Sequence, residues 1–428
     1  MKRAAAVILA AMVTATMFAA CASDKPAEQS TTAAEQSATE QATEKATEAP
    51  EEPYKETHTL YFKDGANGSG ATATFFNSVS GKSESVVMKK IGEEKDGNVF
   101  TCEGNCSAYN MAYITCGGKE TRKFAFNPCV NGWYQSEEDF LPYTQGTTTD
   151  YKPKVEEFKL SGYGHEKLIY VWKPDDYDAA SSEPYDTVYM LDGQITLYLD
   201  KYGQQLKGCP VADEQVKAMM ASTGKKAILV AVDNVGTRDI EMIPKIGVSK
   251  DREMMEKMKS QMGSDEDFEF DSMDGDQFAD FVANTLVPYI QQHYNVRTDA
   301  RHTSIAGVSL SGMEAFYIAV EHPEVFGTCG AFSPSFWEFD DATWDKYAKG
   351  KKFDDNAAFL FLYTGPEQYD TDPHVTNMYN RLKGLGYPED KLALHFNEEG
   401  LHDGTVWRCM FSEFLTAMVY HRIEPLQP

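Results

Sequence analysis

The stretch TSIAGVSLSGMEAFYIAVEHP, residues 303–323, decides the fold. It begins with residues 303–308, a run of small and apolar side chains without any charge, and such continuous runs are typical of strands buried on both faces. From Met313 the chain reads as a helix, which Pro323 ends because proline cannot continue one. A buried strand that passes directly into a helix predicts an α/β domain with a parallel sheet.

The turn between strand and helix, residues 307–311, predicts a nucleophile at its centre. A sharp strand-to-helix turn holds the central side chain clear of the sheet in a strained backbone conformation. The residues two positions to either side must be small, since a bulky side chain would clash across the turn. Gly307 and Ser311 meet this requirement, although the usual pattern has glycine at both places. Ser309 is therefore the candidate nucleophile, and Ser311 is interpreted as a small spacer.

A serine hydroxyl needs a base and an acid further along the chain. His402 lies after the strand-like stretch KLALHF and before a terminal helix, where the order serine, acid, histidine places the base. His395 lies within that strand and His374 in a loop, so both are weaker candidates. The acid is expected just after the strand AFLFLYT, where Glu367 is the favoured residue and Asp370 the alternate.

Two backbone N–H groups must stabilise the oxyanion that forms when a carbonyl is attacked. The first is expected from Leu310, directly after the nucleophile at the start of its helix. The second is expected from Gln194, in the loop after the strand that ends in YMLDG.

The alternation of strand and helix continues through residues 152–428, which predicts a single α/β domain. Further apolar runs lie at 187–191 and 227–232, and a helix is expected over 275–294 from apolar residues at helical spacing. Residues 248–276 are interpreted as an insertion that could form a lid over the site. Three acidic residues in it do not have the spacing of a known calcium loop (Asp271, Asp274, Asp276). The sequence predicts neither a metal site nor a cofactor.

Residues 54–151 predict a small all-β sandwich. Short β-type runs recur there at intervals of about ten residues, broken by glycine, asparagine and serine. The layout resembles the sugar-binding modules of secreted polysaccharide enzymes, in which exposed aromatic rings stack on sugars. The alternative interpretation is that these rings fill the core of the sandwich.

The N-terminus predicts export. Residues 1–21 join a short basic region to an apolar stretch that ends in FAAC, the pattern of a bacterial lipoprotein signal with Cys21 as the lipidated residue. An ordinary secretory signal is the alternative. Residues 22–53 have no aromatic residue and predict a disordered linker. The predicted location is outside the cytoplasm, anchored by lipid to a bacterial membrane.

Cysteine spacing and charge narrow the alternatives further. Four cysteines cluster in the β-rich region (Cys102, Cys106, Cys116, Cys129), and two disulfides are the default expectation for an exported chain, with free thiols or a zinc site as alternatives. The net charge of -26 argues against a nucleic-acid partner, because phosphate binding needs a basic surface. Nothing in the sequence determines the oligomeric state.

The α/β domain resembles the putative esterase family of α/β-hydrolases, which includes esterase D-like enzymes, feruloyl esterases and enterochelin esterases. The matching stretches occur in order: VWKPDDYD, VYMLDGQ, LVAVDNVGTRDIEMIP, FADFVANTLVPYIQQHYNVRTD, IAGVSLSGMEAFYIAVEHPEVFG, AFSPSFW and GLHDGTVWR. The resemblance implies Ser309 as nucleophile and His402 as base, and it places Arg238 and Trp337 close to the substrate. The chain departs from the family at Ser311 and at Gln368, where the family often carries its acid.

These observations predict an exported serine esterase. A tethered enzyme with a sugar-binding module suits acyl or feruloyl esters on plant polysaccharide. The alternatives are a siderophore trilactone as substrate, or a surface glycan-binding protein that retains the fold without catalysis.

Overall fold

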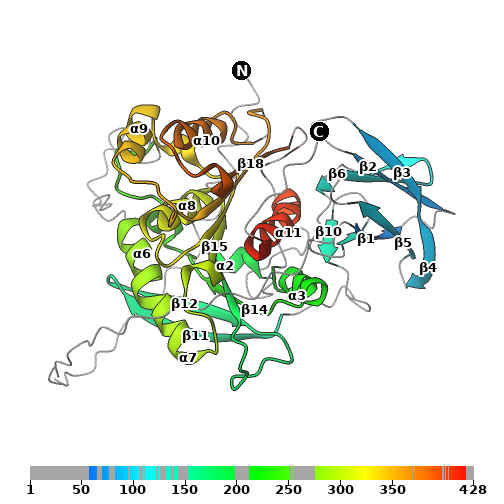
Figure 1. Cartoon of the computed structure of the whole chain (residues 1–428), viewed down its shortest axis with the longest axis horizontal. Helices are drawn as coiled ribbons and strands as arrows, with labels where there is room; N and C mark the ends of the chain where they lie inside the picture. The colour runs from blue at the N-terminus through cyan, green and yellow to red at the C-terminus, as the bar shows by residue number, and fades with distance from the viewer. Residues whose placement is uncertain are drawn as a thin grey trace, which may run out of the picture. The chain divides into compact units, whose positions relative to one another are not determined.

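The computed structural model describes most of the chain between Thr57 and Tyr420 (Figure 1). The gaps are 65–69, 77–81, 95–96, 106–108, 110, 122–123, 126–131, 136–138, 143–152, 198–211, 251–252, 254–274, 369, 398–399, 401 and 403. The signal segment with Cys21, the linker, most of the insertion, and both Asp271 and Asp274 therefore lie outside the described residues. Within the described part, no helix is long and apolar enough to cross a membrane, and no group of three or more His, Cys, Asp or Glu residues could hold a metal ion.

The N-terminal part of the described chain forms two five-stranded β-sheets. The first has the order β10 (Asp139–Pro142), β9 (Gly132–Gln135), β1 (Thr57–Asp64), β5 (Gly97–Asn105), β4 (Lys89–Glu94). The second has the order β3 (Ser83–Val87), β2 (Ala71–Phe76), β6 (Met111–Cys116), β7 (Lys119–Glu120), with β8 (Phe124–Ala125) also paired to β6.

Both of these sheets bury alternate side chains. Strand β2 alternates buried and half-buried residues along its whole length, because successive side chains in a strand point to opposite faces. Leu60 and Phe62 of the first sheet join one buried cluster with Ala73 and Phe75 of the second. This is the packing expected of the predicted sandwich.

Two details of this region differ from expectation. The stretch SVVMKKI, residues 85–91, is one of the β-type runs and reads as a single strand, but it is divided at Met88, where the chain passes from the second sheet into the first. Met88 is itself buried and donates its N–H to Ala71 O. Cys102 and Cys116 carry free thiols, so the expected pair of disulfides is not formed. Burial raises the pKa of Cys102 to about 12. Cys106 and Cys129 lie outside the described residues.

The C-terminal part is built on one eight-stranded sheet. Its order is β11 (Val155–Gly162), β12 (His165–Trp172), β14 (Ala227–Val232), β13 (Asp186–Met190), β15 (Thr303–Val308), β16 (Thr328–Phe332), β17 (Phe359–Thr364), β18 (Leu392–Phe396). The first two strands are antiparallel, and the six from β14 to β18 run parallel. The predicted α/β class with a mainly parallel sheet is confirmed.

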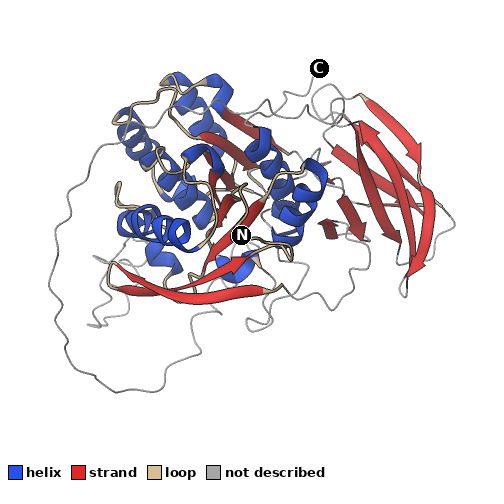
Figure 2. Ribbon diagram, turned by 60° about the horizontal axis from the view of Figure 1, so that its bottom comes forward, coloured by secondary structure: helices blue, strands red, loops and turns tan. Residues whose placement is uncertain are grey.

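Helices cover both faces of this sheet (Figure 2). On one face lie α3 (Ala212–Thr223) and α11 (Gly404–Tyr420); on the other lie α6 (Gly275–Phe281), α7 (Val287–His293), α8 (Leu310–Glu321), α9 (Asp341–Lys349) and α10 (His374–Gly384). Neighbouring residues of one strand enter different cores: Met190 packs with α3 and α11, whereas Tyr189 packs with α6 and α8. Continuous apolar strands are required because both faces are buried.

The helix predicted over 275–294 is present, but it contains an irregular turn. Helix α6 passes through a π-helical turn, Val282–Leu286, before α7 begins. Pro288 stands in the first turn of α7 and has no N–H to donate to the preceding turn. The N–H of Val287 donates to Val282 O, five residues back, which is the hydrogen bond of a π-helix.

Candidate active site

Ser309 occupies a strained turn between β15 and α8. Its backbone φ is 60° and ψ is -122°, a conformation that costs a residue with a side chain about 1–3 kcal/mol. The turn is held by the N–H of Ser309, which donates to Phe332 O at 2.9 Å. A Cβ at Gly307 would lie 2.2 Å from Ser311 O, so only glycine fits there.

Ser311 was predicted to be only a small spacer, but its side chain also forms two hydrogen bonds. Its buried hydroxyl donates to Val308 O at 2.8 Å and accepts from Val308 N at 3.0 Å. A glycine at this position could make neither bond. The hydroxyl therefore ties the first turn of α8 back to the end of β15 and stiffens the turn around Ser309.

The structure brings the predicted base to the predicted nucleophile. His402 Nε2 lies 3.0 Å from Ser309 Oγ, although the two residues are 93 positions apart. His402 precedes α11 and Ser309 precedes α8, and these two helices cover opposite faces of the sheet. His395 pairs instead with Glu413 at 2.7 Å, and His374 begins α10.

The acid that contacts the base is Asp370, the alternate, and the preference for Glu367 is wrong. Asp370 Oδ1 lies 3.0 Å from His402 Nδ1, and the Asp370 side chain is fully buried. After β17 the chain folds back, with the N–H of Asp370 donating to Pro366 O at 2.7 Å. This turn directs Asp370 inward and leaves Glu367 exposed on its outside. The spacing of the two residues gives no sign of this difference.

The two predicted oxyanion donors occupy the first turns of helices on neighbouring strands. Leu310 is the first residue of α8, and Gln194 is the second of the short helix α2 (Gly193–Thr196). The first N–H groups of a helix have no acceptor within it. The loop before α2 lies beside the end of β15, because the N–H of Leu191 donates to Ala306 O at 3.0 Å. The roles of Leu310 and Gln194 remain predictions.

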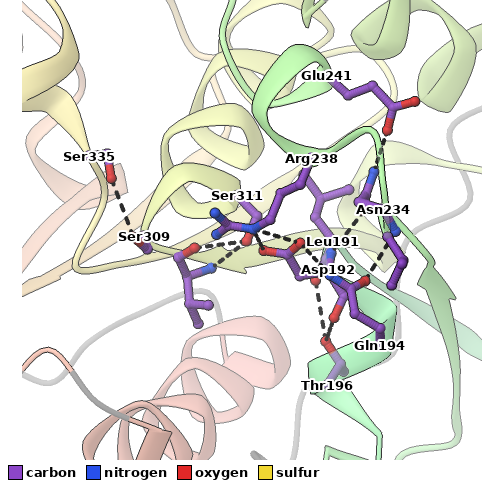
Figure 3. A network of polar contacts seen from close by, with 12 residues as sticks. Leu191, Asp192, Gln194, Thr196, Asn234, Arg238, Glu241, Ser309, Ser311 and Ser335 are labelled. Carbon is purple, nitrogen blue, oxygen red and sulfur yellow. Dashed lines mark hydrogen bonds and ion pairs between the residues drawn. The ribbon is translucent and has the colours of Figure 1, made fainter. Parts of the chain in front are cut away.

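A buried polar network, drawn in Figure 3, holds the Gln194 loop. Asp192 has a positive φ of 55° and is fully buried. Its carboxylate accepts from Gln194 Nε2 at 2.9 Å and from Arg238 Nε at 2.8 Å. Asn234 closes the loop by accepting from Asp192 N and donating its N–H to Gln194 Oε1.

The network continues away from the site through Glu241. This buried carboxylate accepts from Asn234 Nδ2 at 2.8 Å, from Lys167 Nζ at 2.6 Å and from Tyr163 Oη at 2.6 Å. A buried charge is tolerated when it is paired and hydrogen-bonded in this way. The sequence did not single out Asp192, Asn234 or Glu241, although Asp192 directly follows one apolar strand run and Asn234 lies two residues after another.

Arg238 and Trp337, the two residues predicted to lie close to the substrate, differ from each other in their surroundings. Arg238, which begins helix α4 (Arg238–Glu241), forms an ion pair with Asp192 that the sequence does not predict. Trp337 lies half-buried in a short 3₁₀ turn, Phe336–Glu338, two residues after Ser335. The N–H of Ser335 donates to Ser309 O at 3.0 Å, and its hydroxyl lies 3.4 Å from Ser309 Oγ. Substrate contact by either residue remains a prediction.

The fold and this constellation are those of an α/β-hydrolase, and comparison with known proteins shows which family the sequence is similar to. Residues 163–362 match the sequence model described as putative esterase. The α/β domain is thus similar to the putative esterase family over these residues.

Individual relatives are distant. The uncharacterized protein YbbA of Bacillus subtilis is 24% identical over 143 residues, covering 30% of this chain and 57% of YbbA. An endo-1,4-beta-xylanase/feruloyl esterase of Xylanibacter ruminicola is 23% identical over 149 residues, covering 34% of this chain and 19% of that protein. The enterochelin esterase of Shigella flexneri superposes with a TM-score of 0.46 at 14% identity, over 85% of this chain and 92% of that one.

Proposed function

We propose that this protein is a serine esterase in which Ser309 attacks the carbonyl carbon of an ester. His402 Nε2 takes the hydroxyl proton as the bond forms, and it returns that proton to the departing alcohol. Asp370 keeps the other proton of the imidazole on Nδ1, so that Nε2 faces Ser309 with its lone pair. Water then attacks the acyl-enzyme by the same route in reverse, which releases the acid and restores the serine.

One observation carries the proposal: the continuous contact from Ser309 Oγ to His402 Nε2 and from His402 Nδ1 to Asp370, at 3.0 Å for each step. These distances lie within the range required for proton transfer. The strained φ of Ser309 adds support, because strain of this kind occurs where a turn must present a reactive group.

The developing oxyanion would be held by the N–H groups of Leu310 and Gln194. Both groups are presented by rigid elements: Leu310 by the helix that Ser311 ties to β15, and Gln194 by the loop that Asp192 and Arg238 hold. Donors placed before reaction need no reorganisation at the transition state, so they stabilise it strongly.

For the substrate, we propose acyl or feruloyl esters carried by plant polysaccharide. The feruloyl esterase relative supports this class, and the sequence of the β region before the catalytic domain resembles sugar-binding modules. We further propose that the protein is exported and anchored through a lipid on Cys21, which would place the enzyme where insoluble polysaccharide is met.

The test is hydrolysis of a small ester panel by the purified protein, with Ser309→Ala as the matched control. The panel contains p-nitrophenyl acetate, methyl ferulate, acetylated xylan and a catecholate trilactone. Hydrolysis that is lost in Ser309→Ala supports the mechanism, and preference for ferulate or xylan supports the substrate class. Preference for the trilactone would overturn the substrate class alone. Hydrolysis that survives in Ser309→Ala, or failure of a fluorophosphonate to label Ser309, would refute the mechanism.

A further inference from the structure

A chain of hydrogen-bond donors stands behind the Asp370 carboxylate. Trp407 Nε1 donates to Ser333 Oγ at 2.9 Å, and Ser333 Oγ donates to Asp370 Oδ2 at 2.9 Å. The opposite oxygen, Oδ1, faces His402. The mechanism proposed above uses neither Ser333 nor Trp407.

The chemistry of the three groups sets the direction of this chain. An indole N–H can only donate, and an ionised carboxylate can only accept. A serine hydroxyl has a single proton, so the Ser333 hydroxyl, which accepts from Trp407, must give its proton to Asp370. Gly365 N–H donates to the same carboxylate oxygen at 2.8 Å. Two donors thus hold Oδ2, and the carboxylate is oriented with Oδ1 toward the base.

The strained backbone conformation at Ser333 indicates that its hydroxyl has a functional role. Ser333 is fully buried and has a positive φ of 45°, at the point where β16 ends. Glycine adopts such a conformation without strain, yet here the position carries a side chain. Of the side-chain atoms that a glycine would lack, only the hydroxyl forms hydrogen bonds, and both of these bonds belong to the donor chain.

Trp407 is placed to act on the base as well as on the acid. It lies in the first turn of α11, five residues after His402, and its ring meets the His402 ring edge to face at 5.0 Å between centroids, with an interplanar angle of 86°. A single side chain therefore limits the tilt of the imidazole and, through Ser333, the rotation of the carboxylate.

We propose that Ser333 and Trp407 are positioning residues that lock Asp370 in the rotamer serving His402, so that the catalytic assembly spans five side chains. This inference rests on the proposed function, because it assigns the two residues to the same reaction.

The test compares Ser333→Gly, Ser333→Ala and Trp407→Phe, which keeps the ring but removes the N–H. Both Ser333 variants lose a hydrogen bond to a charged group, which is worth enough for kcat to fall by about 10- to 100-fold, with KM nearly unchanged. Trp407→Phe loses a bond to the neutral Ser333 hydroxyl, so its kcat should fall by about 2- to 10-fold. Ser333→Gly should be as slow as Ser333→Ala although it unfolds at a higher temperature, since it relieves the strain. If Ser333 had only a structural role, the more stable Ser333→Gly would have a higher kcat than Ser333→Ala. Normal kcat in a folded Ser333→Gly would overturn the proposal.

A double variant tests the order of the chain. If Trp407 acts on the carboxylate only through Ser333, adding Trp407→Phe to Ser333→Ala should slow kcat no further. Losses that multiply would show that the indole N–H acts independently, and the chain would be refuted.

A measurement without substrate separates this inference from the proposed function. The proton between His402 Nδ1 and Asp370 should give a downfield proton NMR signal, assigned by its loss in Asp370→Ala. We expect the signal to move or broaden in Ser333→Gly. If the signal differs between the wild type and Ser333→Gly but the wild type hydrolyses no ester, the proposed function is refuted and the donor chain is supported. An unchanged signal in Ser333→Gly would refute the donor chain.

Discussion

Replacing Asp370 by asparagine should nearly abolish hydrolysis while leaving the fold intact. Asp370 Oδ2 accepts from Gly365 N–H and from the Ser333 hydroxyl, so the single oxygen of asparagine must take that place or leave both donors unpaired. Its NH₂ group would then face His402 Nδ1. The imidazole would have to accept there and carry its proton on Nε2, where it could no longer take the proton of Ser309.

The expected loss is about 10⁴-fold in kcat, the cost of holding a catalytic histidine in the wrong tautomer. At 1.36 kcal/mol for each factor of ten, this is about 5 kcal/mol of transition-state stabilisation. The assay is steady-state hydrolysis of p-nitrophenyl acetate, with Ser309→Ala as the baseline and thermal unfolding as the check on folding. Glu367→Gln is the matched control, since Glu367 is exposed, and should behave like the wild type. Asp370→Asn retaining a tenth of the wild-type kcat, or Glu367→Gln losing most of it, would refute the assignment of the acid.

Three further predictions concern stability. Burial raises the pKa of Glu314 well above its ordinary value, and neither of its carboxyl oxygens has a hydrogen-bond partner among the described residues; the folded state therefore keeps this proton, and its stability falls as the pH rises above about 4.3, where the unfolded chain releases it. In urea titrations Glu314→Gln should gain stability over the wild type between pH 4 and pH 8, and a difference independent of pH would contradict this reasoning. Gly307→Ala should lower the unfolding temperature and stop fluorophosphonate labelling of Ser309, because the new Cβ would meet Ser311 O at 2.2 Å; normal labelling would show that the turn can adapt. Lys167→Met should cost about 3–5 kcal/mol in the free energy of unfolding, because it leaves the Glu241 carboxylate buried without its cation; a loss below about 1 kcal/mol in urea titrations would argue against a charged Glu241.

The parts of the site that the sequence predicted are those set by local pattern. A strand, a tight turn and a helix follow one another within 303–321, so Ser309 and the first N–H of its helix could be placed without knowledge of distant residues. The position of His402 followed from the order of elements after β17. The strands β13, β14, β15 and β17 are buried on both faces of the sheet, so they read as continuous apolar runs and were predicted closely.

The parts that the sequence did not predict depend on contacts between distant segments. Glu367 and Asp370 lie in one turn, and the backbone hydrogen bond from Asp370 to Pro366 decides which of them faces the base. The pair between Asp192 and Arg238 joins residues 46 positions apart, and the side-chain partners of Ser333 come from the turn after β17 and from α11. Hydrophobic periodicity in the sequence does not indicate such contacts between distant residues. The division of the strand at Met88 is of the same kind, since either half alone has normal strand composition.

The two separate cores of the α/β domain have a consequence for how this protein would fail. Ser309 is carried by a helix that packs into one core, whereas His402 is attached to α11, which packs into the other. The 3.0 Å distance between Ser309 Oγ and His402 Nε2 therefore requires that both helical layers pack against the sheet at the same time. If either helical layer loosened, the distance between Ser309 Oγ and His402 Nε2 would increase well before the sheet itself unfolded. On gradual heating, ester hydrolysis should thus disappear ahead of the loss of β-structure.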